Sequence, residues 1–128
     1  MYTNDYYDLS YDRAKNQINW KVKGFWKSAQ EVPDMEKHWD SIFAQAKKPG
    51  YNILGDVTEM KPPPQDVQDL HQKVQAKIVQ LGVHKLAVIV GSALTDMTVK
   101  HIGKKSGLTQ MTRNFADKAS GQAWLNER

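Results

Sequence analysis

A run of five apolar residues, Leu86-Ala87-Val88-Ile89-Val90, constrains the fold more than any other segment of this chain. The run has the length of a strand but lacks the polar–apolar alternation of a half-exposed strand. Strands without that alternation are typical of parallel sheets that are covered on both faces. The run therefore predicts an α/β fold in which this strand is central.

Two earlier segments, Tyr7 to Tyr11 and Gln17 to Gly24, show the period of two that is expected of strands buried on one face. In the second segment Ile18, Trp20 and Val22 share a face. The polar stretch between the segments has the length of a hairpin turn. We therefore expect these strands to pair antiparallel.

Two helices are predicted from apolar residues at three- and four-residue spacing. The first follows a capping-box pattern from Ser28 to Glu31, with Pro33 as a second candidate start, and ends at Pro49-Gly50. The second follows three successive prolines and ends at Gly82, where a left-handed cap is expected. Their inward stripes are Met35, Trp39, Ile42, Phe43 and Ala46 in the first helix, and Val67, Leu70, Val74, Ile78 and Leu81 in the second.

The remaining segments complete an alternating order of strands and helices. A strand is expected over Tyr51 to Val57, a third helix over Leu94 to Ile102, and an edge strand over Gln110 to Phe115, before a last helix capped by Asp117. This order predicts a mixed, mostly parallel sheet of about five strands covered by about four helices. Residues 1–128 form a single domain in this prediction.

Composition narrows the class of protein without identifying a partner. The 40% hydrophobic and 25% charged residues are those of a globular domain, and the absence of cysteine removes disulfides and thiolate chemistry. No apolar stretch reaches the length of a membrane span and the first residues do not resemble a signal peptide, so a cytoplasmic protein is expected. The net charge of +4 comes from scattered lysines, which does not favour specific nucleic-acid binding.

The order of elements and several short motifs resemble STAS-like domains, the sulfate-transporter and anti-sigma-factor-antagonist family (STAS/SEC14 type), in particular its small bacterial members. The motifs are a Gly-Phe-Trp turn after the second strand, Leu54-Gly55-Asp56 closing the third, and Phe115-Ala116-Asp117 leading into Ala123-Trp124-Leu125. The resemblance covers nearly the whole chain. It implies a non-enzymatic module that binds a protein, a nucleotide or a lipid-like ligand.

In the anti-sigma-factor antagonists, a serine or threonine at the start of the second helix is phosphorylated, and the added charge switches binding. The matching stretch here, Pro62 to Val67, contains no hydroxyl group. The resemblance therefore predicts a domain without the phospho-switch. Asp66 lies near that place, and it is expected to cap the helix rather than to mimic a phosphate.

No catalytic, metal or cofactor site emerges from the motifs. The four histidines have no recognised ligand spacing, and no nucleophile, base and orienting group can be assembled. His38 and His71 are expected on helix flanks as partly exposed residues. Ser92 lies in a strand-to-helix turn without the flanking glycines of a nucleophile elbow, and its backbone donors could instead hold an anionic group. No enzyme and no cofactor are predicted.

The leading functional hypothesis is a regulatory or interaction domain that binds a protein partner. The carboxyl ends of parallel strands are the usual binding edge of such sheets, and a rigid proline loop loses little entropy on binding. The predicted contact residues are Asp56, Thr58, Met60, Asp66 and Asp69. A homodimer is a further option, through exposed strand edges at Tyr7 to Tyr11 or Gln110 to Phe115.

The alternative hypothesis is a carrier or sensor of a small apolar or amphipathic, lipid-like ligand held between sheet and helices. Methionine and aromatic side chains suit such pockets, although they suit cores equally well. The predicted ligand-binding residues are Phe25, Trp26, Met60, Ser92 and Met97.

Overall fold

The computed structural model of the chain describes residues 1–32, 34–91, 97, 100 and 107–127. Its elements follow the predicted alternation of strands and helices. They are β1 (Tyr2–Thr3), β2 (Tyr7–Asp12), β3 (Gln17–Val22), η1 (Ala29–Glu31), α1 (Met35–Gln45), β4 (Asn52–Asp56), α2 (Gln65–Gln80), β5 (Lys85–Ile89), η2 (Thr109–Met111), β6 (Thr112–Phe115) and α4 (Lys118–Asn126).

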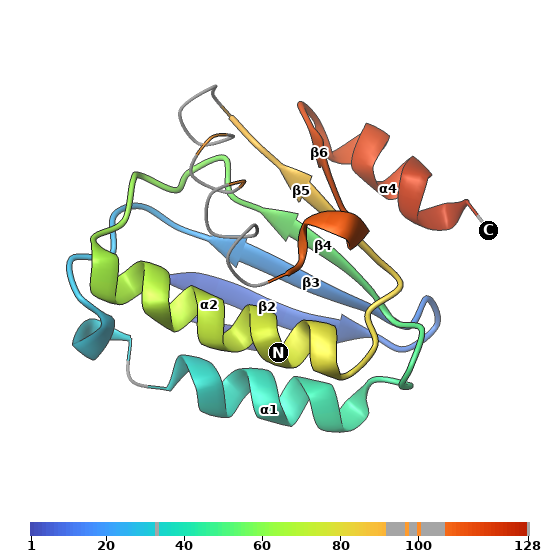
Figure 1. Cartoon of the computed structure of the whole chain (residues 1–128), viewed down its shortest axis with the longest axis horizontal. Coiled ribbons are helices and arrows are strands. Elements are labelled where there is room, and N and C mark those ends of the chain that lie inside the picture. The colour runs from blue at the N-terminus through green and yellow to red at the C-terminus, as the bar shows by residue number, and fades with distance from the viewer. Residues whose placement is uncertain (33, 92–96, 98–99, 101–106, 128) are drawn as a thin grey trace.

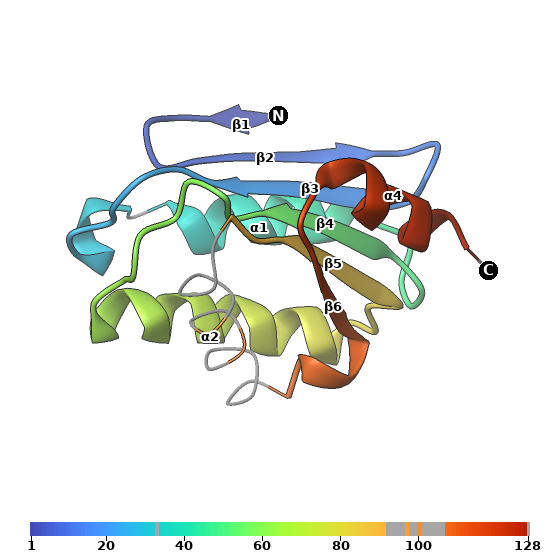
Figure 2. The ribbon, with the colours of Figure 1, turned by 90° about the horizontal axis from the view of Figure 1, so that it is seen from above.

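The strands form one mixed sheet in the order β1-β2-β3-β4-β5-β6; Figure 1 labels β2 to β6, and Figure 2 also labels β1. Strands β1, β2 and β3 are antiparallel, whereas β3, β4, β5 and β6 run parallel. The α/β class, the antiparallel hairpin and the mostly parallel sheet are confirmed. The sheet has six strands where about five were expected, because a strand of two residues is too short to show a period.

The added strand β1 changes one edge of the sheet. It pairs Tyr2 with Leu9 and Thr3 with Asp8, so β2 lies between β1 and β3. The expectation that Tyr7 to Tyr11 is an edge strand is therefore wrong. The other edge is β6, as predicted.

Strand β5 shows why its sequence is apolar at every position. Leu86 and Val88 pack into the main core beneath α1 and α2, while Ala87 and Ile89 face a smaller core formed with Leu125 of α4. Figure 2 shows α1 and α2 on one side of the sheet and α4 on the other. A strand covered on both faces has no position at which water favours a polar side chain.

The helix ends confirm some local signals and correct others. Gly82 follows α2 with φ of +83°, and the Asp117 side chain accepts a hydrogen bond from Ser120 N at 2.8 Å, as expected of a left-handed cap and an N-cap. The capping-box pattern is followed only by the short η1, and α1 begins at Met35. The predicted third helix lies outside the described residues except for Met97 and Lys100.

Candidate ligand-binding site

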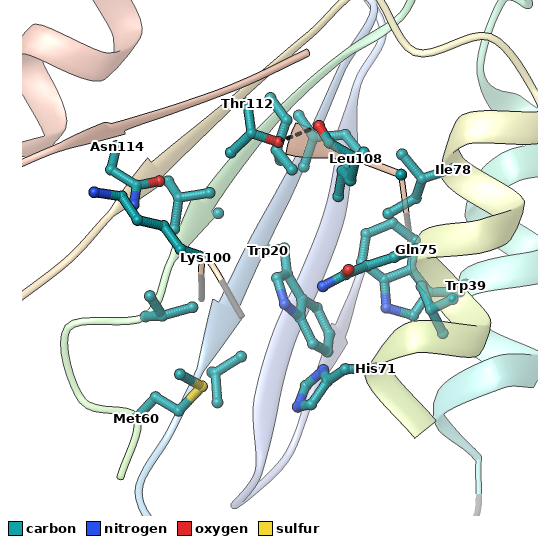
Figure 3. Close-up of a pocket in the computed structure, with 18 of the residues that line it drawn as sticks. Trp20, Trp39, Met60, His71, Gln75, Ile78, Lys100, Leu108, Thr112 and Asn114 are labelled. Atoms are coloured by element: carbon teal, nitrogen blue, oxygen red, sulfur yellow. Dashed lines mark hydrogen bonds between the residues drawn. The ribbon is translucent and has the colours of Figure 1, made fainter. Parts of the chain in front are cut away.

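A cavity of about 560 Å³ lies between the sheet and the helices α1 and α2. Most of its wall is apolar, and Figure 3 shows the side chains that reach it from both layers. The apolar contributors include Val22, Val57, Val74, Ile78, Leu86 and Val88. The volume falls within the range of roughly 300–1,000 Å³ that is common for small-molecule pockets.

Simple periodicity places these residues on the cavity wall. Trp20 and Val22 are two residues apart in β3 and therefore point to the same face of the sheet. In α2, His71 lies in one stripe with Val74 and Ile78 at helical spacing, and all three line the cavity. The sheet thus forms the floor of the cavity and α2 forms one wall.

His71 is the most unusual residue of the cavity. Its side chain is only 8% exposed, and one face of its ring stacks on Trp26 with the ring centroids 4.9 Å apart. Burial lowers the pKa of His71 to about 4, because desolvation disfavours the charged imidazolium. The ring is therefore neutral at pH 7, with one nitrogen that donates a hydrogen bond and one that accepts.

A second polar group lies nearby on α1. Trp39 is 1% exposed and its Nε1 has no hydrogen-bond partner among the described residues. Its ring tilts against that of Trp20, with the centroids 5.1 Å apart. Gln75 extends from α2 toward the same two rings in Figure 3. One group of polar atoms thus lies on the α1–α2 side of the cavity.

The opposite side of the cavity, along β6, carries the remaining polar side chains. Thr112 donates a hydrogen bond from Oγ1 to Leu108 O at 2.7 Å, which holds the chain just before β6 against the strand. Lys100 and Asn114 lie together on this side in Figure 3, away from His71. The described part of the lining contains no carboxylate.

The residues predicted for ligand binding are divided by the structure. Met60 is 8% exposed and lines the cavity. Trp26 is buried behind His71, and its Nε1 donates to Tyr6 O and Lys23 O. Phe25 and Met97 are 52% and 68% exposed and are not part of the described lining, and Ser92 lies outside the described residues.

Sequence reasoning missed the importance of three cavity residues: His71, Trp20 and Gly55. The expectation that His71 is partly exposed is wrong, because its spacing from Val67 and Val74 places it inside the apolar stripe of α2. That spacing was visible in the sequence and could have indicated its burial. Nothing in the sequence indicated that the stripe faces a cavity.

The described part of the chain has neither a cluster of metal ligands nor a membrane-spanning helix. No three histidine, aspartate or glutamate side chains among these residues gather closely enough to hold a metal ion. None of the described helices combines the length and the apolar character needed to cross a membrane.

Comparisons with known proteins agree with this architecture. No family model and no curated protein matches the sequence. Among solved structures, the chain is similar to an uncharacterised protein of the DUF3478 family with a SpoIIAA-like fold from Shewanella loihica, at 19% identity and a TM-score of 0.73, covering 98% of each chain. It is also similar to an anti-sigma factor antagonist from Mycobacterium paratuberculosis, at 11% identity and a TM-score of 0.61, covering 99% of this chain and 100% of that one. The chain has a STAS-like fold.

In this STAS-like domain the polar residues predicted for partner binding lie near the same end of the sheet and the start of α2. Asp56 Oδ1 accepts hydrogen bonds from the backbone N and the Oγ1 of Thr58, which closes a turn after β4. Asp69 accepts a hydrogen bond from Gln65 and is exposed. These three side chains are within reach of solvent, whereas Met60 points into the cavity.

Asp66 has a different structural role from the one expected. The residue at the N-cap of α2 is Pro64, and Asp66 lies in the first turn, where its Oδ2 accepts a hydrogen bond from Ala29 N at 2.8 Å. The carboxylate therefore ties η1 to the start of α2. The expectation that Asp66 caps the helix is wrong, because its side chain bonds to a neighbouring segment instead.

Proposed function

We propose that this STAS-like domain is a carrier or sensor that binds a small apolar or amphipathic molecule in the cavity between the sheet and α1 and α2. The observation that carries the proposal is the cavity itself, about 560 Å³ between the sheet and the helices and partly open to solvent. The proposed activity is binding, without turnover of the ligand.

The size of the cavity supports an occupant. A closed dry void of this volume would cost on the order of 10 kcal/mol, at about 24 cal/mol per Å³. That cost is similar to the whole stability of an ordinary domain. This cavity is partly open to solvent, so water or a ligand can enter it. A filled cavity is therefore favoured over a dry one, and its apolar walls favour an apolar molecule over water.

Gly55 provides a second argument for an occupant. It lies inside the central strand β4, where glycine weakens a strand and often marks the close approach of a ligand. A Cβ atom at Gly55 would lie 3.7 Å from Trp20 Cδ1 and 3.9 Å from Ala87 O, which are ordinary contacts. The surrounding protein atoms thus do not require glycine here, and its absent side chain leaves space in the cavity.

The test combines ligand extraction with a variant that fills the cavity. Native mass spectrometry of protein purified gently from its own cells should show a mass above that of the bare 14.6 kDa chain. The apolar dye phenylnaphthylamine should bind the emptied protein. Gly55→Val should weaken dye binding by about tenfold or more, because the two methyl groups of valine occupy space that the dye would otherwise contact. The melting temperature of the variant should stay the same or rise.

Ser10→Val is the matched control, because it also introduces a valine into a strand, here β2, at a position outside the described cavity lining. It should leave dye binding unchanged. Bare protein from cells, together with equal dye binding by wild type and Gly55→Val, would refute the proposal.

A protein partner is the second candidate function, supported by the resemblance of the fold to an anti-sigma factor antagonist. The exposed Asp69 and the turn of Asp56 and Thr58 would form the contact surface. Asp69→Lys removes only the hydrogen bond with Gln65 within the described contacts and should not affect the cavity. A partner that co-purifies with wild type and with Gly55→Val but not with Asp69→Lys would support this function; retention by all three proteins would contradict it.

A further inference from the structure

His71 places a hydrogen-bonding group where packing alone would favour an apolar residue. Its ring is stacked on Trp26 on one side, and Figure 3 shows it projecting beneath Trp20 toward the part of the cavity lined by Met60. No hydrogen bond from the described residues reaches either ring nitrogen. The ring nitrogens therefore open onto the cavity, where a ligand or water can reach them, and they have no protein partner among the described residues.

A polar group in an apolar cavity costs about 1–3 kcal/mol unless a ligand or a water molecule hydrogen-bonds to it. A phenylalanine at this position would keep the stacking on Trp26 without that cost. Buried polar groups without a partner are uncommon in folded proteins and call for an explanation. A polar group of a bound ligand would satisfy the ring and explain the histidine.

The charges around the cavity limit what that ligand group can be. No carboxylate is present in the described lining, so an ammonium group would be buried without a counterion. A carboxylate at His71 would face a ring that is neutral at pH 7, with Lys100 on the opposite side of the cavity (Figure 3). A hydroxyl group carries no charge, and it can both donate and accept, so it matches either tautomer of the ring.

On these grounds, and resting on the proposed ligand-binding function, we infer that the cavity takes a neutral amphipathic alcohol whose hydroxyl group hydrogen-bonds to His71 and whose apolar body fills the space along β3, β4 and β5. A body of roughly 15 to 20 non-hydrogen atoms fits the cavity if each takes about the 30 Å³ of a liquid water molecule.

The experiment compares ligands with the same alkyl chain and different polar ends. Dodecanol, dodecanoate and dodecylamine are titrated into wild type, His71→Phe and His84→Phe, with binding followed by tryptophan fluorescence. His84→Phe is the control because His84 is exposed and lies outside the described cavity lining. Dodecanol should bind wild type and His84→Phe most tightly, and His71→Phe should weaken it about tenfold, the value of one hydrogen bond.

An NMR measurement keeps the test independent of the variant. The imidazole nitrogen shifts of His71 in wild type should change on addition of dodecanol and stay those of a neutral ring. Equal dodecanol affinity of wild type and His71→Phe, without a shift change, would overturn the inference and leave the ligand-binding function standing. Tighter binding of dodecanoate, with a protonated His71, would also overturn it. Failure of every ligand and of phenylnaphthylamine to bind wild type would instead refute the ligand-binding function, and the inference with it.

Discussion

The buried neutral His71 makes a quantitative prediction for the stability of the domain in acid. Its pKa is about 4 in the folded chain and 6.5 when exposed to water. Below pH 6.5 the unfolded chain therefore binds a proton that the folded chain does not, so stability falls as the pH falls. The loss is expected between about pH 6.5 and pH 4, and it is complete once both states are protonated.

The linkage relation gives the size of the effect. Lowering the pH from about 8 to about 5.5 should remove about 1.4 kcal/mol of unfolding free energy through His71, and about 3 kcal/mol should be lost by pH 4. Among the described residues, desolvation is the only cause of the pKa shift, and no neighbouring charge contributes. The loss should therefore depend little on ionic strength.

The assay is urea unfolding of wild type and His71→Phe at several pH values. The phenylalanine retains an aromatic ring against Trp26 but cannot titrate. Subtracting the two curves removes the contributions of the carboxylates and of the other three histidines, which both proteins share. The difference should change by about 3 kcal/mol between about pH 8 and pH 4 in favour of the variant in acid.

Two results would refute this reasoning. A difference between the proteins that stays constant with pH would show that His71 titrates alike in both states. An NMR titration that places the His71 pKa near its ordinary value of 6.5 would show that the ring is hydrated in the folded protein. The NMR result also decides the matter if His71→Phe does not fold.

Two further predictions concern stability alone. Gly82→Ala should destabilise the domain by at least about 2 kcal/mol, because φ is +83° and a Cβ atom would lie 2.6 Å from Pro49 Cβ. Gly24→Ala, with φ of +63° and open space around it, should cost only the backbone strain of about 1 kcal/mol, and equal losses in thermal unfolding would contradict the clash. Tyr51→Phe should cost about 1 kcal/mol in urea unfolding, because the buried hydroxyl donates to Ile78 O at 2.7 Å. An unchanged midpoint would show that this bond does not stabilise the fold.

Local patterns were enough to predict most of the elements. The alternation around Trp20 and Val22 predicted a strand with one buried face, and the unbroken apolar run of β5 predicted a strand between two layers. Asp117 was predicted as a helix cap from its residue type and place, and its side chain does cap α4. These sequence patterns predict the elements correctly because each pattern depends on the geometry of a single strand or a single helix turn.

The candidate site was less accessible to such reasoning. Met60 was predicted both as a surface contact and as a cavity residue, and the structure places it in the cavity lining. His71 was placed on a flank, although the spacing of α2 brings it into the buried stripe. Strand β1 was missed because two residues carry no period, and its pairing with β2 depends on the return of the chain at Asn4 to Tyr7.

The sequence by itself determined the α/β class, the parallel centre of the sheet and most of the buried face of β3, α1 and α2, because periodicity follows from the geometry of one element. The tertiary structure decided that α2 packs over the sheet with a space of about 560 Å³ left open, and that His71 faces it. The sequence pattern of an apolar stripe is the same whether the stripe packs against a neighbouring element or lines a cavity. The difference depends on the summed volumes of side chains from β3, β4, β5, β6, α1 and α2, which meet only in the folded chain.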